Sequence, residues 1–280
     1  MEAFSPVSKG ARPAILKDYR EYLRARDGVV DAKQRTLSKR EQGMRRFEAV
    51  GDRAMDRDLF ALQYERFDPK RETSPETLLL LALVKVNAAE AYGVHQTIDG
   101  AMARAQRSDD DTEVVLLVEE FYHTKILLSA ARLYGIDVPA PAKPHFGLRA
   151  LVASIATFPD FLARPLTLAG EMMGVLVFLR LLDATRTILK DAPVVRDAVE
   201  ERLTEILIDE IGHMSFQRLS MGSAGLAQAK ALLPMVAFGL AGSIPEVRAL
   251  GAIPHAPVDG ITALGRQGLP ETVRRNAFFA

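Results

Sequence analysis

Two short segments with the same spacing constrain this chain more than any other feature of its sequence. Residues 119–123 read Glu-Glu-Phe-Tyr-His and residues 209–213 read Asp-Glu-Ile-Gly-His, so each holds Glu-x-x-His with an acid directly before the Glu. On a helix, positions i and i+3 share a face, so Glu120 and His123 can converge on one metal ion, as can Glu210 and His213. One such motif is weak evidence, but two copies are poorly explained by chance. The pair predicts two long helices that face a shared metal site.

The surrounding pattern is helical, and no segment shows convincing strand alternation. Ser74 and Pro75 suit the N-cap and first turn of a helix, and Gly135 suits a helix end. Pro159 and Pro165 predict a break. The sequence therefore predicts an all-α fold with long helices at 76–106, 111–134, 166–190 and 194–221, followed by a shorter apolar helix near 227–240.

Two further acids occupy apolar faces of the other predicted helices. Glu171 is the only Glu between residues 141 and 189, and its neighbours are nearly all apolar. A carboxylate in such surroundings is costly to bury unless it is paired or binds a cation. Glu90 shares a helix face with an apolar stripe formed by Leu79, Leu83 and Val86. We expect both acids to join the two motifs.

The acids that precede the motifs predict a second layer around the metal. Glu119 and Asp209 each lie four residues before a motif histidine. An acid there can accept the free imidazole N–H of a ligand histidine, which fixes its tautomer and raises its basicity. The alternative is that both acids face solvent.

The order Glu, Glu-x-x-His, Glu, Glu-x-x-His resembles the ligand set of the ferritin-like di-iron and di-manganese carboxylate proteins. The resemblance covers residues 74–221 and implies a four-helix bundle with a long crossover and additional N- and C-terminal helices. It implies two iron ions, with Fe/Mn or Mn/Mn as alternatives, and O2 as co-substrate. The paired acids look like the oxygen-activating branch of desaturases, hydroxylases and N-oxygenases. The implied metal ligands are Glu90, Glu120, His123, Glu171, Glu210 and His213.

Residues near these ligands are candidates for a substrate pocket. Small residues on inner faces make room, although close helix packing is an equally good reason for them. Ile206 occupies the position of an extra histidine ligand in arylamine N-oxygenases, which weakens that reading. The pocket candidates are Tyr92, Gly93, Tyr122, Gly170, Gly174, Met173 and Ile206.

The whole chain, 1–280, is expected to form a single domain. Residues 1–73 form a charged N-terminal extension, 74–221 the bundle, and 222–280 a C-terminal helix and tail that pack on it. Basic residues gather at 33–46, where the interpretations are a solvated arm or a docking surface for an acidic partner. The apolar segment 231–244 leaves three roles open: a substrate entrance, a dimer contact or a membrane contact.

The amino-acid composition excludes several kinds of metal site and argues against one class of partner. The chain has no cysteine, which removes iron–sulfur clusters, thiolate metal sites and cysteine nucleophiles. It has 36 basic and 36 acidic residues, which argues against a nucleic-acid partner. The stretch 165–182 contains Glu171 and Arg180, and 231–244 is too short to span, so we expect no transmembrane segment. The absence of cysteine fits a cytoplasmic location.

The first functional hypothesis is a non-haem di-iron oxygenase or oxidase that hydroxylates, desaturates or N-oxygenates a small organic substrate. It needs an external electron donor, such as a ferredoxin or a reductase, and a homodimer is compatible with it. The alternative is a metal-handling protein, a ferroxidase or manganese catalase without an organic substrate. A third hypothesis, a metal-free interaction bundle, requires Glu90 and Glu171 to be exposed.

Overall fold

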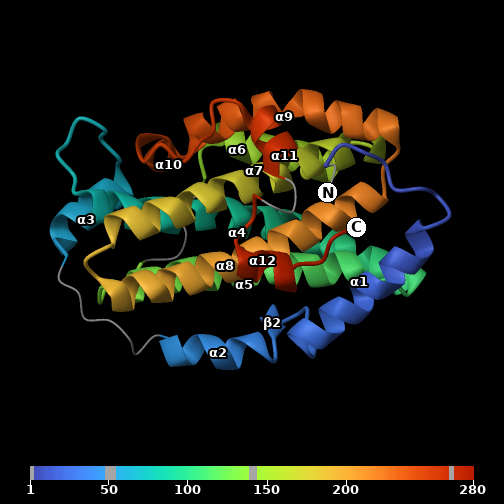
Figure 1. Ribbon diagram of the computed structural model, residues 1–280, viewed down its shortest axis with the longest axis horizontal. Coiled ribbons are helices and arrows are strands. Elements are labelled where there is room, and N and C mark those ends of the chain that lie inside the picture. Colours follow the sequence, from blue (N-terminus) through green and yellow to red (C-terminus); the bar gives the residue numbers. More distant parts are fainter. Residues whose placement is uncertain (1–2, 48–54, 139–143, 265–267) are drawn as a thin grey trace.

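The predicted all-α fold is confirmed by the computed structural model, which describes residues 3–47, 55–138, 144–264 and 268–280, without the side chains of 45–47, 87–89 and 156. Four long helices lie side by side at the centre of the molecule (Figure 1). They pair as two helical hairpins, the first formed by α4 (Pro75–Ser108) with α5 (Thr112–Arg132) and the second by α7 (Asp160–Ile188) with α8 (Pro193–Leu219).

The helix ends follow local chemistry, with one exception. Ser74 caps α4 by accepting a hydrogen bond from the backbone N–H of Thr77 at 3.1 Å. Gly135 has a φ of 62°, as expected of a glycine that follows a helix. The predicted break at Pro165 is wrong, because α7 runs through this proline. Pro165 has no N–H, so the helix loses one backbone hydrogen bond, to the carbonyl of Phe161. Phe161 lies in the exposed first turn of α7.

The N-terminal segment lies against the α5 and α8 side of the four helices (Figure 1). Gly28 ends α1 with a φ of 75°, and a Cβ there would stand 2.7 Å from Ser38 Oγ, so the turn requires glycine. A two-stranded hairpin follows, which the sequence did not predict, and its buried Leu37 packs near α5. The elements on this side are α1 (Arg12–Asp27), β1 (Val30–Asp31), β2 (Thr36–Leu37) and α2 (Arg40–Phe47), whereas α3 (Arg57–Glu65) contacts α4.

Most of the remaining helices cover the opposite side. In Figure 1, α9 and α11 lie above α7, with α6 between this layer and the central helices. The connection between the two hairpins contains α6, which contacts α4, α7 and α9. These elements are α6 (Phe146–Thr157), α9 (Ser223–Ser243), α10 (Pro245–Ala249) and α11 (Pro257–Leu264), while α12 (Glu271–Asn276) lies against α8.

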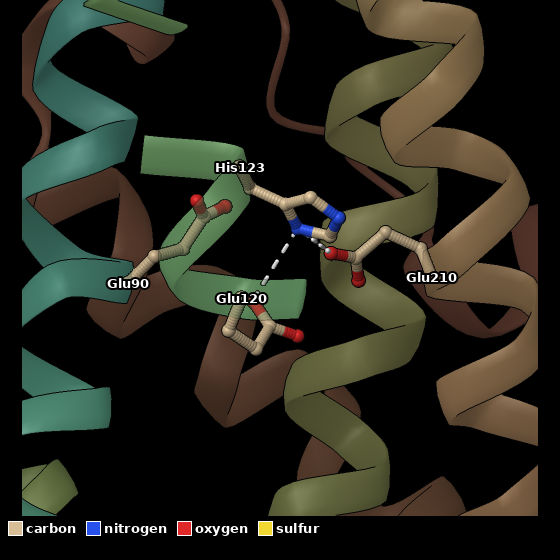
Figure 2. Close-up of side chains that lie close together, drawn as sticks. All are labelled: Glu90, Glu120, His123 and Glu210. Atoms are coloured by element: carbon tan, nitrogen blue, oxygen red, sulfur yellow. Dashed lines mark ion pairs between the residues drawn. The ribbon is translucent and has the colours of Figure 1, made fainter. Parts of the chain in front are cut away.

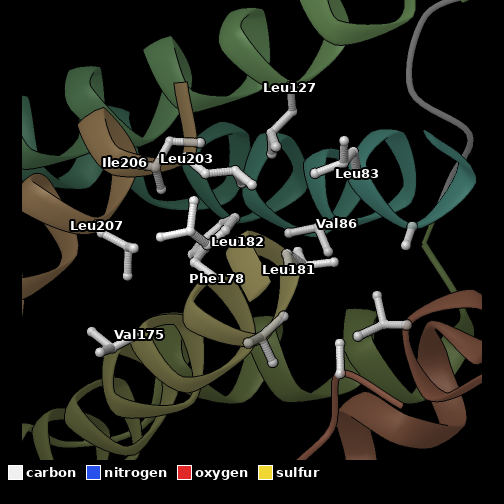
Figure 3. Packing of buried hydrophobic residues seen from close by; sticks show 14 of the residues in the cluster. Leu83, Val86, Leu127, Val175, Phe178, Leu181, Leu182, Leu203, Ile206 and Leu207 are labelled. Atoms are coloured by element: carbon white, nitrogen blue, oxygen red, sulfur yellow. The ribbon is translucent and has the colours of Figure 1, made fainter. Parts of the chain in front are cut away.

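The space between the four long helices is filled unevenly. Towards the start of α4, side chains such as Leu83, Leu127, Leu182 and Leu203 are almost fully buried and pack against one another (Figure 3). Towards the start of α5, a cavity of about 960 Å³ separates the helices. The motif residues lie between this packed half and this hollow half.

The expectation of a cytoplasmic chain without a transmembrane segment is contradicted by the length and the apolar composition of its helices. Three of the described helices, α4, α7 and α9, are long and apolar enough to cross a membrane, by length and composition. The apolar stretch near 231–244 belongs to a helix of 21 residues, and Glu171 and Arg180 do not disqualify a helix of 29. The most apolar window is 67% buried within the protein in α4 and α7, but only 28% in α9.

Candidate metal centre

The structure brings all six predicted ligands together from four different helices. Their ligand atoms form two overlapping sets, and within each set all atoms lie within 4.8 Å of one another. Glu90 and His123 belong to one set, and Glu171 and His213 belong to the other. Glu120 and Glu210 belong to both. Buried carboxylate and imidazole groups at these positions could hold a metal ion, and Figure 2 shows the first set converging.

The two histidines are oriented alike. His123 turns Nδ1 toward Glu120 and Glu210, at 3.5 and 3.4 Å, and hydrogen-bonds Asp209 through Nε2 at 2.9 Å. His213 turns Nδ1 toward Glu120 at 2.7 Å and hydrogen-bonds Glu119 through Nε2 at 3.0 Å. In a neutral imidazole whose Nε2–H donates to a carboxylate, Nδ1 carries no proton, and its lone pair is free to bind a metal.

Each outer acid therefore serves the opposite helix. Asp209 comes from α8 and holds the histidine of α5, while Glu119 comes from α5 and holds the histidine of α8. Both acids are almost fully buried, at 2% and 1% exposure, which excludes the alternative that they face solvent.

The charge environment fits a cation at the centre of the six residues. Burial alone would lower the pKa of His123 and of His213, yet the surrounding carboxylates raise the pKa of both imidazoles well above the ordinary value. Burial and then Glu120 raise the pKa of Glu210 to about 8. The protein thus stabilises positive charge here, which metal ions would supply in place of protons.

Two buried ligand atoms also lack a hydrogen bond. They are Glu90 Oε2 and His123 Nδ1, which belong to the same ligand set. A buried polar atom without a partner is costly, so such atoms call for an explanation. A metal ion bound between them would satisfy both.

Two arginines from the N-terminal segment complete the outer layer. Arg40 is 7% exposed and pairs with Asp209 and with Glu119, the latter at 3.3 Å, and Arg26 pairs with Asp209 at 2.7 Å. Burial alone would raise the pKa of Asp209, but these two guanidinium groups hold that pKa well below its ordinary value. Asp209 therefore stays ionised and keeps accepting from His123.

For Arg40, this finding corrects the interpretation of the basic segment 33–46 as a solvated arm or a docking surface. Lys33 and Lys39 are exposed, but Arg40 is buried and its guanidinium carbon lies 4.5 Å from the ring centre of Tyr122. The side chains of Arg45 and Arg46 lie outside the described residues. Sequence reasoning missed Arg26 and Arg40. One signal could have pointed to them. Glu119 and Asp209 were expected to lie buried beside the predicted ligand histidines, and buried acids need basic partners, which had to come from another part of the chain.

Asp27 is an acid of this layer whose protonation should set a pH dependence of stability. It is fully buried and accepts from Arg40 at 3.3 Å through one oxygen, while the other has no hydrogen bond. Burial and then Glu119 raise its pKa from 3.8 to about 8. Because the folded state binds this proton more tightly, the stabilisation is complete below pH 3.8 and is lost as the pH rises to 8.

We therefore expect Asp27→Asn to reduce the decline of the free energy of unfolding between pH 5 and 8. Urea denaturation of the metal-free wild type and variant at each pH would measure it. Asp31→Asn, at a half-buried position in the hairpin, is the control and should keep the wild-type slope. Parallel curves for wild type and Asp27→Asn would contradict the prediction.

Gly174 makes room for the side chain of Glu210, one of the candidate ligands. A Cβ at this position would lie 2.8 Å from Glu210 Oε2, whereas a Cβ at Gly170, one turn earlier on α7, would meet nothing within 4 Å. We expect Gly174→Ala to displace the Glu210 carboxylate and weaken metal binding by about 10- to 100-fold, the range seen when ligand supports are disturbed. Competition with a chromophoric chelator would measure the affinity. Gly170→Ala is the matched control, and equal losses in both variants would contradict the role of Gly174.

The predicted pocket residues divide into two groups. Gly93, Gly170, Gly174 and Met173 line the 960 Å³ cavity, which also reaches Glu90, Glu120, Glu171, Glu210 and His213. The other three do not line it. Tyr122 points away from the ligands and donates to the carbonyl of Arg40 at 3.1 Å, Ile206 is fully buried in the packed half (Figure 3), and Tyr92 is half-buried outside the lining.

Comparison with known proteins gives no match: no family model, no curated protein and no solved structure matches this chain. What this protein can do must therefore follow from the chemistry of the residues at its site.

Proposed function

We propose that this chain is a non-haem di-iron oxygenase or oxidase of the ferritin-like carboxylate type. The observation that carries the proposal is the pair of ligand sets that share Glu120 and Glu210. Two shared carboxylates between two imidazoles suit two metal ions held side by side. Four carboxylates also balance the charge of two divalent ions, and this ligand chemistry suits iron or manganese.

The proposed fold follows from the same elements. Helices α4, α5, α7 and α8 form a ferritin-like four-helix bundle, and the connection that contains α6 is its long crossover. This bundle is the core of a single domain, with the N-terminal segment on one side and the C-terminal helices packed on it.

The chain's own residues would hold and orient the metals. Glu90 and the His123 Nδ1 atom would hold one ion, Glu171 and the His213 Nδ1 atom would hold the other, and Glu120 and Glu210 could serve either because they belong to both sets. When bound, a pair of iron ions supplies, with O2, the oxidation of an organic molecule by hydroxylation, desaturation or N-oxygenation. Glu119 and Asp209 keep the histidines in the binding tautomer, and Arg26 and Arg40 keep Asp209 ionised.

The cavity beside the ligands favours an organic substrate over metal handling alone. A ferroxidase or manganese catalase needs only small inorganic substrates, whereas 960 Å³ is at the upper end of the range for pockets that hold organic ligands. The electrons come from an external donor, such as a ferredoxin or a reductase, because the chain has no cysteine for an iron–sulfur cluster.

Metal analysis tests the proposal directly. Protein purified from cells supplied with iron and manganese should carry about two metal ions per chain, two iron or one iron with one manganese, as in the carboxylate bundles. With a chemical reductant, the loaded protein should consume O2. Metal content near zero after anaerobic loading with Fe(II) would contradict the proposal. Metal binding with peroxide dismutation, and no oxidation of an organic substrate, would favour the manganese catalase alternative.

A further inference from the structure

We propose that the substrate of this centre is a neutral, mainly apolar molecule whose apolar body lies beneath α6. Calling this molecule a substrate rests on the proposed function. The binding site for an apolar molecule does not depend on that function. It concerns a cavity wall that no metal ligand forms.

The first observation is the pattern of α6. Leu148, Leu151, Val152 and Ile155 follow the spacing i, i+3, i+4 and i+7, which normally marks a helix face buried in the core. All four line the cavity and stay half-buried, and none of the described residues of α6 is fully buried. Leu151 and Ile155 pack in part against the core, but the stripe as a whole is only half-buried where it lines the cavity.

The second observation is the lining that the other helices contribute to this cavity. It is apolar too, with Val94 of α4, Val177 of α7, and Val236 and Leu240 of α9. The same cavity extends to the metal-ligating carboxylates. An apolar molecule that fills it would bury the α6 stripe and would place one of its carbons beside the metal centre.

The third observation concerns charge. Apart from the metal ligands, the cavity is lined by three arginines, Arg12, Arg104 and Arg164, and by three acids, Asp110, Glu113 and Asp160, so their formal charges cancel. Arg104 pairs with Glu113 at 2.7 Å and Arg164 pairs with Asp160 at 3.2 Å. A lining of this kind gives no net preference for an anion or a cation, and burying an unpaired charge in the apolar part would be costly. The lining therefore favours a neutral ligand.

The chain has no tryptophan, so a single introduced indole can report on the cavity. Phe158, between α6 and α7, lines the cavity and is 45% exposed, whereas Phe238 of α9 is 83% exposed and lies outside the lining. We would titrate full-length Phe158→Trp and Phe238→Trp with 1-decanol below its solubility limit, and with decanoate and decyltrimethylammonium below their critical micelle concentrations. Each titration would be run with metal-free and with iron-loaded protein.

We expect 1-decanol to shift the emission of Phe158→Trp to shorter wavelength in a saturable manner, and to leave Phe238→Trp unchanged. It should bind at least tenfold more tightly than either charged probe. Adding Val152→Phe to the reporter should weaken binding at least tenfold, whereas Ala153→Phe, on the exposed side of α6, should not. Equal responses in the two reporters, indifference to Val152→Phe, or tighter binding of a charged probe would overturn the proposal.

The metal content of the same samples separates the two claims. Metal binding without saturable binding of 1-decanol would overturn the substrate class and leave the dinuclear centre standing. Saturable binding of 1-decanol without metal binding would overturn the proposed function and leave an apolar ligand site.

Discussion

Replacing Glu120 with alanine should leave the purified chain with almost no bound metal. This carboxylate belongs to both ligand sets and lies 2.7 Å from His213 Nδ1 and 3.5 Å from His123 Nδ1. Losing it removes a ligand from both metal positions at once, so the content should fall from about two ions per chain to near zero. Elemental analysis after anaerobic loading with Fe(II) measures the loss.

Glu113→Ala is the matched control for this substitution. Glu113 lies on the same helix, about two turns before Glu120, and pairs with Arg104 at the partly exposed mouth of the cavity. It should keep full metal content. His213→Ala and the exposed His255→Ala form a second matched pair with the same expected contrast. Retention of full dimetal occupancy in Glu120→Ala would remove the assignment of this residue as a shared ligand.

Replacing Arg40 with methionine should lower the free energy of unfolding of the metal-free chain by about 3–5 kcal/mol, the cost of removing one member of a buried ion pair. The substitution keeps most of the side-chain length but leaves Asp209 and Glu119 with less compensation for their buried charge. The metal affinity should fall as well, because these two acids orient the ligand histidines. Urea denaturation and chelator competition measure the two effects.

Lys39→Met is the control for Arg40→Met, because Lys39 is the exposed neighbour in sequence. Surface substitutions of this kind usually change stability by no more than about 0.5 kcal/mol. If both variants unfold at the same urea concentration with equal slopes, the pairing of Arg40 with the buried acids contributes nothing to stability. Arg40→Lys adds a further comparison, because it keeps the charge but cannot bond several acids through one planar group.

The sequence was sufficient to predict the parts of the fold that depend on local pattern. The four long helices begin and end within a few residues of their predicted bounds, except that α7 starts at Asp160 and runs through Pro165. The six candidate ligand residues could be found because helical spacing, or a lone acid on an apolar face, marks each of them. Those signals are contained within single helices.

The contributions of Arg26, Arg40 and α6 could not be predicted, because each depends on contacts between segments far apart in the chain. Arg40 lies 169 residues before Asp209, and charged residues in such a segment are usually solvated. The stripe on α6 predicts a core helix, but only its position over α4 and α7 shows that it meets a cavity. Tyr122 lies two residues from Glu120, which on a helix places it on another face, toward α2.

The crossed bonds between His123 and Asp209 and between His213 and Glu119 also act on the alignment of two helices. Each bond joins α5 to α8, and the two bonds lie one helical turn apart. Sliding α5 along α8 by one turn would break both bonds together and take from two buried imidazole Nε2 atoms the carboxylates that accept from them. The two motifs therefore set the relative height of α5 and α8, so the spacing of the candidate ligands on these two helices is fixed by the protein's own hydrogen bonds.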